Sequence, residues 1–164
     1  MEIWDLVDKN GNRTGKSWPR NLHDEIPDGY YHVAVEVWVR VGDKLLLTQR
    51  HPSKTDGLMY DCPGGAVVSG EDFALGAKRE LYEEVGISAD LEDLVYIGSM
   101  IRGCCYAMTY LLVLDELPEI RLQPTEVVGF ITVTSSELED MADRLTGGTY
   151  KRYIEYKDRL LGSK

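Results

Sequence analysis

The 164-residue chain has few cysteines, few basic residues and no long apolar run, and each shortage excludes a class of protein. Its three cysteines provide no CxxC spacing, which argues against a zinc ribbon or a thioredoxin-type redox site and favours a reducing cytoplasm. The longest apolar run covers residues 110–114, far shorter than the roughly 20 residues of a membrane-spanning helix. The amino-terminal residues show neither a basic stretch nor an apolar core, so we expect no secretion signal and no membrane partner.

Basic residues are outnumbered by acidic ones. Lys and Arg total 18 against 28 Asp and Glu, which gives a formal net charge of −10. Proteins that bind nucleic acid normally carry a basic surface, so we expect no stable nucleic-acid binding. An anionic small-molecule substrate would also be repelled unless a cation stood between it and the protein.

The composition that remains is that of an ordinary globular protein. Hydrophobic residues make up 43% and charged residues 28%. A chain of this length buries enough surface to fold without a disulfide or a metal, and it contains no internal repeat or low-complexity segment. The sequence therefore predicts one domain over residues 1–164.

The patterns of apolar and polar residues predict most of the secondary structure. An Asn10-Gly11 turn predicts a β-hairpin within about residues 1–20. Helical spacing predicts a central helix over 71–85 that ends at Gly86, a short helix with Ser135 at its N-cap, and a final helix over 150–161. Further strands are expected over residues 31–41, 44–49, 61–68, 94–102, 106–114 and 127–134, with a loop at 52–57. Strands on both sides of one helix indicate an α/β fold with a mixed sheet packed between helices.

The central helix carries the residues that suggest chemistry. Glu80, Glu83 and Glu84 have the spacing i, i+3 and i+4, which places three carboxylates on one helix face. Like charges at this spacing destabilise a helix by about 0.2–0.5 kcal/mol per pair, and Arg79 alone does not neutralise three acids. A hard divalent cation such as Mg²⁺ would neutralise these acids, because it takes carboxylate and phosphate oxygens as ligands. An adjacent stripe suited to packing on a sheet consists of Ala74, Ala77, Leu81 and Val85.

Residues 65–87 resemble the signature of the Nudix hydrolases, G-x5-E-x7-R-E-U-x-E-E-x-G-U, in which U is apolar. Chance would produce its seven fixed identities about once in 10⁸ starting positions. The resemblance implies a Nudix-type α/β/α sandwich with a mixed β-sheet and an N-terminal β-hairpin. It also implies an enzyme that hydrolyses a diphosphate linkage, typically in a nucleoside diphosphate linked to another moiety. The residues that match this Nudix box are Gly65, Glu71, Arg79, Glu80, Glu83, Glu84 and Gly86, with Leu81 and Ile87 at the apolar positions.

The resemblance further implies roles for individual residues. Glu80, Glu83 and Glu84 correspond to ligands of Mg²⁺ or Mn²⁺, assisted by a carbonyl group near Gly65. Arg79 would form salt bridges to these acids, and Glu71 would make a supporting contact near the metal.

A further glutamate beyond the box often serves as ligand or base in this family. Glu126 is the best candidate, with Glu84 as an alternative base, so we expect Glu83, Glu84, Glu126 and Arg79 to be needed for catalysis. Asp115, Glu116 and Glu119 also remain open as bases. Arg50 and Lys54 either bind phosphate or face solvent. Family members are frequently dimers, so a homodimer is an expected assembly.

Residues outside the box resemble the branch of the family related to isopentenyl-diphosphate isomerase; they include residues 4–8, 29–32 and 45–50. An isomerase acting on prenyl diphosphates is therefore an alternative function. That isomerase has Cys-Gly-His where this chain has Gly64-Gly65-Ala66, and Cys62, beside Pro63, is expected to be a packed, inert thiol. A non-catalytic binding module is a second alternative, against which the complete box argues. The sequence favours hydrolysis. It does not identify the leaving moiety or the number of metal ions.

Overall fold

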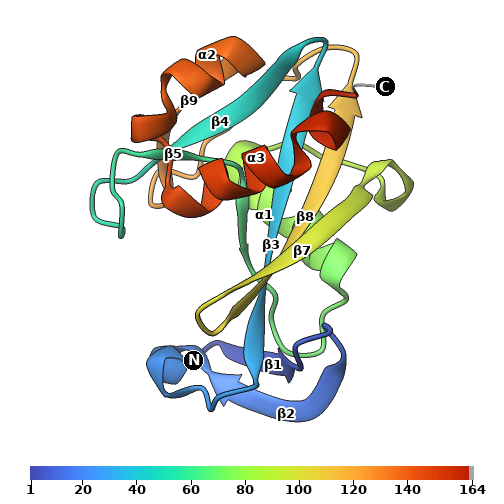
Figure 1. Cartoon of the computed structure of the whole chain (residues 1–164), viewed down its shortest axis with the longest axis vertical. Coiled ribbons are helices and arrows are strands. Elements are labelled where there is room, and N and C mark those ends of the chain that lie inside the picture. Colours follow the sequence, from blue (N-terminus) through green and yellow to red (C-terminus); the bar gives the residue numbers. More distant parts are fainter. Residues whose placement is uncertain (163–164) are drawn as a thin grey trace.

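A long central strand, β3 (Tyr31–Val41), organises the sheet. It pairs in parallel with β8 and antiparallel with β1, β4 and β6. The computed structural model, which describes residues 1–162, forms one mixed sheet of nine strands (Figure 1). The other strands are β1 (Ile3–Val7), β2 (Arg13–Pro19), β4 (Lys44–Arg50), β5 (Tyr60–Asp61), β6 (Gly64–Ala66), β7 (Val95–Arg102), β8 (Cys105–Leu114) and β9 (Val127–Thr134).

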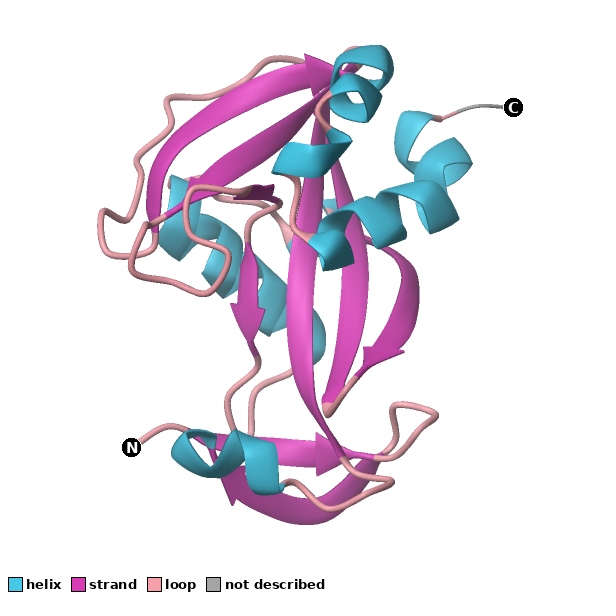
Figure 2. Cartoon of the chain, turned by 60° about the vertical axis from the view of Figure 1, so that its left-hand side comes forward, coloured by secondary structure: helices cyan, strands magenta, loops and turns pink. Residues whose placement is uncertain are grey.

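Helices cover both faces of this sheet because β3 is apolar on both sides. Val35 and Val39 pack with Leu81 and Val85 of α1 (Phe73–Val85) in one core cluster. On the opposite face, a second cluster joins Trp38 to the helices α2 (Ser135–Asp140) and α3 (Gly147–Leu161). Figure 2 shows the strands lying between α1 and the two helices α2 and α3. This is the expected α/β/α sandwich.

The N-terminal hairpin is confirmed. β1 and β2 pair antiparallel from Ile3 with Pro19 to Val7 with Arg13, and β1 also pairs with β3. The side chain of Asp8 accepts hydrogen bonds from the backbone N–H groups of Asn10 and Asn12 and so closes the turn. Figure 1 shows the hairpin at the opposite end of the molecule from α2. It lies across one end of β3, next to β6.

The prediction of one strand over residues 61–68 was wrong. The segment contains β5 and β6, which pair with different partners, β4 and β3. Pro63 stands between them; it has no N–H to donate, and its carbonyl accepts from Val37 N at 2.8 Å. The chain therefore crosses from β4 to β3 at this point, which brings Gly64 and Gly65 to the middle of the sheet.

Helix termini differ from the prediction by a few residues. The central helix begins at Phe73, with Asp72 as N-cap accepting from Ala74 N and Leu75 N. The N-cap of α2 is Thr134 rather than Ser135, and Thr134 forms a capping box with Glu137. The last helix begins at Gly147, three residues early, after the N-cap Thr146.

Three short 3₁₀ helices were not predicted: η1 (Arg20–Glu25), η2 (Leu91–Asp93) and η3 (Ala142–Arg144). The expected end of the central helix is confirmed, since Gly86 has a φ of 75° and a left-handed conformation. In the part of the chain that the structure describes, no helix is both long and apolar enough to cross a membrane.

Candidate active site

The candidate site lies where α1 packs against the short strand β6. Gly64 and Gly65 pair with β3 on one side and contact α1 on the other. A Cβ on Gly65 would lie 2.6 Å from Oε1 of Glu80, and a Cβ on Gly64 would collide with the backbone of β3. Gly64 therefore has no room for a side chain against the backbone of β3, and a Cβ on Gly65 would displace the carboxylate of Glu80.

Arg79 links three of the acids of the box. Its Nε and Nη2 atoms bind both carboxylate oxygens of Glu71, at 2.7 and 2.9 Å. Its Nη1 atom contacts Glu80 at 2.6 Å and Glu83 at 3.3 Å. Nη2 also donates to the carbonyl of Ala66 at 3.0 Å. The guanidinium thus ties the helix to the loop before it and to the end of β6.

Glu84 is the most enclosed of the acids on the helix. Its side chain is 7% exposed, and Gly64 N donates to its Oε2 at 3.3 Å. Burial raises the pKa of Glu84 to about 8, and the charges of Asp61 and Glu80 act in the same direction. Burial also raises the pKa of Glu80, against the lowering effect of Arg79. These two carboxylates are costly to keep charged without a cation beside them.

The donors at this place fit a hard divalent cation. They are carboxylate oxygens and the backbone of a glycine strand, which is the chemistry that Mg²⁺ and Mn²⁺ take. Among residues 1–162, however, no three acidic, histidine or cysteine side chains converge closely enough to form a ready-made metal site. Arg79 draws Glu80 and Glu83 to itself, and Glu84 turns toward Gly64. The acids therefore share a helix face without forming a preformed cage.

Glu126 and Lys54 form an ion pair beside these acids. Both line a cavity of about 190 Å³ that Glu80 and Glu83 also line. Glu126 directly precedes β9, and its carbonyl accepts from His51 N at 2.9 Å, which holds the two loops together. Desolvation lowers the pKa of Lys54. The structure thus places both of these candidate residues in the cavity beside the acids of α1, which we call the acid cavity.

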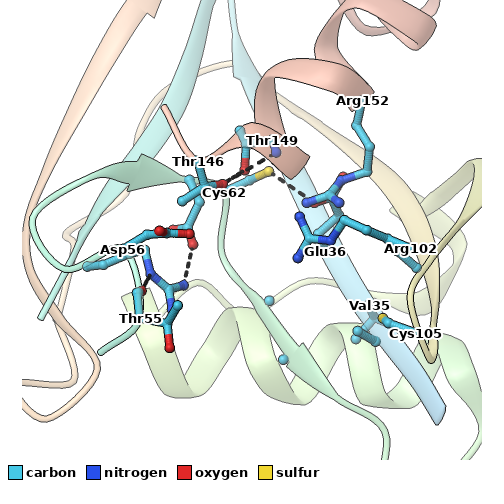
Figure 3. A pocket seen from close by; sticks show the side chains of 16 residues that line it. Val35, Glu36, Thr55, Asp56, Cys62, Arg102, Cys105, Thr146, Thr149 and Arg152 are labelled. Atoms are coloured by element: carbon cyan, nitrogen blue, oxygen red, sulfur yellow. Dashed lines mark hydrogen bonds and ion pairs between the residues drawn. The ribbon is translucent and has the colours of Figure 1, made fainter. Parts of the chain in front are cut away.

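Arg50 lies apart from the acid cavity. Its Nη1 binds Oδ2 of Asp61 at 2.7 Å, and its Nε donates to the carbonyl of Thr55 at 2.8 Å. Arg50 and Asp61 line a second cavity of about 250 Å³, which Gly64 and Gly65 also border (Figure 3). We call this the arginine cavity, because Arg102 and Arg152 reach it as well.

Sequence reasoning missed the buried charges of the arginine cavity. Glu36 lies on β3, forms an ion pair with Arg152, and accepts hydrogen bonds from Trp38 Nε1 at 3.1 Å and Thr109 Oγ1 at 3.0 Å. A signal did exist, since an acid in the middle of an apolar strand needs a buried partner. The partner itself comes from α3 and could not be identified from the sequence.

A third, more open cavity of about 740 Å³ lies toward the N-terminal hairpin. Trp4 and His32 stack there with ring centroids 4.2 Å apart, and Arg20 and His23 line its rim. We call it the aromatic cavity. Gly65 borders all three cavities, so they meet at one point of β6.

Three of the alternative bases lie elsewhere. Asp115, Glu116 and Glu119 line none of the three cavities, and Glu119 pairs with the exposed Arg121 at 3.5 Å.

Cys62 borders the arginine cavity but is buried, and its thiol contacts Glu36 Oε2 at 3.6 Å. Burial raises the pKa of this thiol well above its usual range, as expected for a packed, unreactive cysteine.

Comparison with known proteins agrees with this architecture. The family model of the NUDIX domain matches residues 30–153. The chain is 31% identical to an uncharacterised Nudix hydrolase of Clostridium acetobutylicum, over 91% of this chain and 78% of that protein. It is 25% identical to isopentenyl-diphosphate Delta-isomerase 1 of Mesocricetus auratus, over 92% of this chain and 77% of that protein.

The fold also resembles that of a solved structure. A Deinococcus radiodurans crystal structure superposes with a TM-score of 0.75 at 22% identity, covering 94% of this chain and 99% of that one. With a family match over most of its length and an intact box, the chain belongs to the Nudix hydrolase family.

Proposed function

We propose that the protein hydrolyses a diphosphate linkage in a nucleoside diphosphate joined to another moiety, with Mg²⁺ or Mn²⁺ as cofactor. The observation that carries the proposal is the meeting of three chemically different cavities at Gly65. The acid cavity suits a diphosphate with its metal, the aromatic cavity suits a base, and the arginine cavity suits a polar moiety. A molecule with a diphosphate at its centre has this same three-part form.

The metal would be held by Glu80, Glu83 and Glu84 with a backbone oxygen near Gly65, and it would neutralise phosphate charge and acidify a bound water. Arg79 fixes Glu80 and Glu83 from one side through the contacts described above. Glu71 fixes Arg79 in turn by accepting two hydrogen bonds from it. These bonds stabilise the charged form of Glu71 and lower the pKa of the Glu71 carboxyl. The network thus prepares the face of the helix that binds the cofactor.

Glu126 is the residue we assign as base. It lies in the acid cavity with Glu80 and Glu83, and its ion pair with Lys54 keeps a cation at its side. On substrate binding Lys54 can exchange Glu126 for a phosphate oxygen, which leaves the carboxylate free to accept a proton from water. Glu84 is the alternative, although its enclosure beside Gly64 leaves it little room for a water molecule.

Hydrolysis of a defined set of diphosphates tests the proposal. ADP-ribose, UDP-glucose, NADH and diadenosine diphosphate would be incubated with Mg²⁺ or Mn²⁺, and the released monoesters measured after phosphatase treatment. We expect turnover of at least one compound, its loss in EDTA, and a fall of at least 100-fold in Glu84→Gln. Glu155→Gln, which changes an exposed glutamate of α3, is the matched control and should keep wild-type activity. Metal-independent turnover, or an unaffected Glu84→Gln, would refute the assignment.

Isomerisation of prenyl diphosphates is a second candidate, favoured by the 25% identity to the isomerase and by Cys62 beside Glu36 in the arginine cavity. The buried thiol and the side-chain-free Gly64-Gly65 strand disfavour it. Incubation with isopentenyl diphosphate separates the two, because isomerisation yields dimethylallyl diphosphate without releasing phosphate.

We place the reaction in the cytoplasm, since all three cysteines are free.

A further inference from the structure

The arginine cavity has an unusual lining for a ligand pocket. Its sixteen residues include three arginines, three acids and three threonines, with no Phe, Tyr or Trp. Pockets that take a nucleobase or a prenyl chain normally offer an aromatic or a large apolar surface. This cavity is therefore built for a polar molecule rich in hydrogen-bonding groups.

One end of the cavity is positive. Arg102, at the end of β7, and Arg152, on α3, both point into it (Figure 3). Their guanidinium groups lie over Gly148, where a Cβ would stand 3.1 Å from Nη1 of Arg152 and closer still to Arg102. Glu36 neutralises Arg152 through its ion pair. Within residues 1–162, no carboxylate lies within 4 Å of Arg102.

This imbalance leaves an uncompensated cation next to a second guanidinium. Arg102 is exposed, so water screens its repulsion with Arg152, but it lacks the carboxylate partner that Arg152 has in Glu36. Nε of Arg152 is buried and finds no hydrogen-bond partner among the described residues. An oxyanion between the two arginines would give Arg102 a partner and accept forked hydrogen bonds from both side chains.

The other end of the cavity is acidic and rich in acceptors. Asp61 is held there by Thr48 and Arg50, and the exposed Asp56 also lines this end of the cavity. A carboxylate fixed as that of Asp61 is accepts hydrogen bonds from hydroxyl groups. A ligand that fills the cavity therefore presents hydroxyls at one end and an oxyanion at the other.

We propose that the arginine cavity selects substrates whose leaving moiety is a sugar with a second oxyanion, a phosphate or a carboxylate, bound by Arg102 and Arg152. The proposal rests on the proposed function, since it names the class of moiety attached to the diphosphate. Gly64 and Gly65 border both the acid cavity and the arginine cavity, so a sugar joined to the diphosphate reaches the arginines directly over this strand.

Two pairs of substrates test the proposal. UDP-glucuronate and UDP-glucose differ by a carboxylate on the sugar, and ADP-ribose 1″-phosphate and ADP-ribose differ by a phosphate on the terminal ribose. We expect the charged member of one pair to be hydrolysed with at least tenfold higher kcat/KM, which also identifies the oxyanion. Arg102→Gln should abolish that ratio, and Arg102→Lys should restore part of it. The exposed Arg121 provides the matched control, Arg121→Gln, which should retain the ratio.

Equal rates within both pairs, or a preference that survives Arg102→Gln, would overturn the proposal. If no compound is hydrolysed, the proposed function fails, and calorimetry in EDTA then decides the inference alone. Ribose 5-phosphate or glucuronate should bind the wild-type protein and bind Arg102→Gln at least tenfold more weakly. Absence of binding, or equal binding to both proteins, would refute the cavity's assignment.

Discussion

Gly65 and the carboxylate of Glu80 lie in direct contact, with no room between them for even a methyl group. The contact joins the strand β6 to the acid face of α1. It explains why the first position of the box is glycine: the backbone of that residue must approach the acids closely. The position of Glu80 therefore depends on the absence of a side chain at residue 65.

Substitution of Gly65 by alanine should displace Glu80 and impair catalysis more than stability. Overpacking of this kind costs about 1–3 kcal/mol of stability, while a shift of the acid should lower kcat/KM by about 100-fold. Urea unfolding and hydrolysis of the best diphosphate substrate measure the two effects. Gly129→Ala, where the added Cβ meets only ordinary contacts, is the control. Wild-type kcat/KM in Gly65→Ala would contradict the role given to this contact.

Arg79 should not be replaceable by lysine. Lysine keeps the charge but cannot bind both oxygens of Glu71 while also contacting Glu80 and the carbonyl of Ala66. We expect Arg79→Lys to lose roughly 1–3 kcal/mol of stability. In a double-mutant cycle with Glu71→Gln, the coupling energy should be about 0.5–3 kcal/mol. Additive effects of the two substitutions on urea unfolding would mean that the observed contacts are energetically unimportant.

The acid face of α1 could be predicted because helix geometry is a local property. The spacing of Glu80, Glu83 and Glu84 fixes their common face whatever surrounds the helix. The same holds for the left-handed end at Gly86, which needs a residue without a side chain. The cap of α2 shows the limit of this reasoning, since Thr134 and Ser135 can both accept the capping bond and only the end of β9 decides between them.

The arginine cavity could not be predicted because its parts are distant in sequence. Glu36 and Arg152 meet only once α3 packs on the face of the sheet toward which the Glu36 side chain of β3 points. Arg102 joins them through the pairing of β7 with β8, a relationship that no local pattern specifies. The pairing of Lys54 with Glu126 was missed for the same reason, although both residues were identified as candidates.

Glu126 should prove to be the base rather than a structural acid. Glu126→Gln removes the proton acceptor and keeps the shape of the side chain, so kcat should fall by about 10²–10⁴-fold. The acidic limb of the pH profile of kcat should disappear as well. Lys54→Met tests the ion pair separately and should raise KM, because the lysine's phosphate contact is lost. A Glu126→Gln protein with an unchanged pH profile would transfer the role of base to Glu84.

His32 should make the protein sensitive to mild acid. Burial against Trp4 lowers the pKa of His32 to about 4, and Nδ1 has no hydrogen-bond partner within the described residues. An unfolded chain binds this proton near pH 6.5, whereas the folded protein binds it only near pH 4. Stability is therefore fully present above pH 6.5, falls as the pH drops through this window, and loses nothing more from His32 below pH 4.

The size of this loss is at most about 3 kcal/mol, because the ring is not wholly enclosed. Replacement by phenylalanine keeps an aromatic ring against Trp4 and removes the titration. Urea unfolding of wild type and His32→Phe at pH 8 measures the packing difference, and the same pair at pH 6.5 to 4 measures the proton. Carboxylates titrate in both proteins and cancel in the difference. The difference in unfolding free energy between the two proteins should shift in favour of His32→Phe as the pH falls. A constant difference would show that the folded and unfolded states protonate His32 equally.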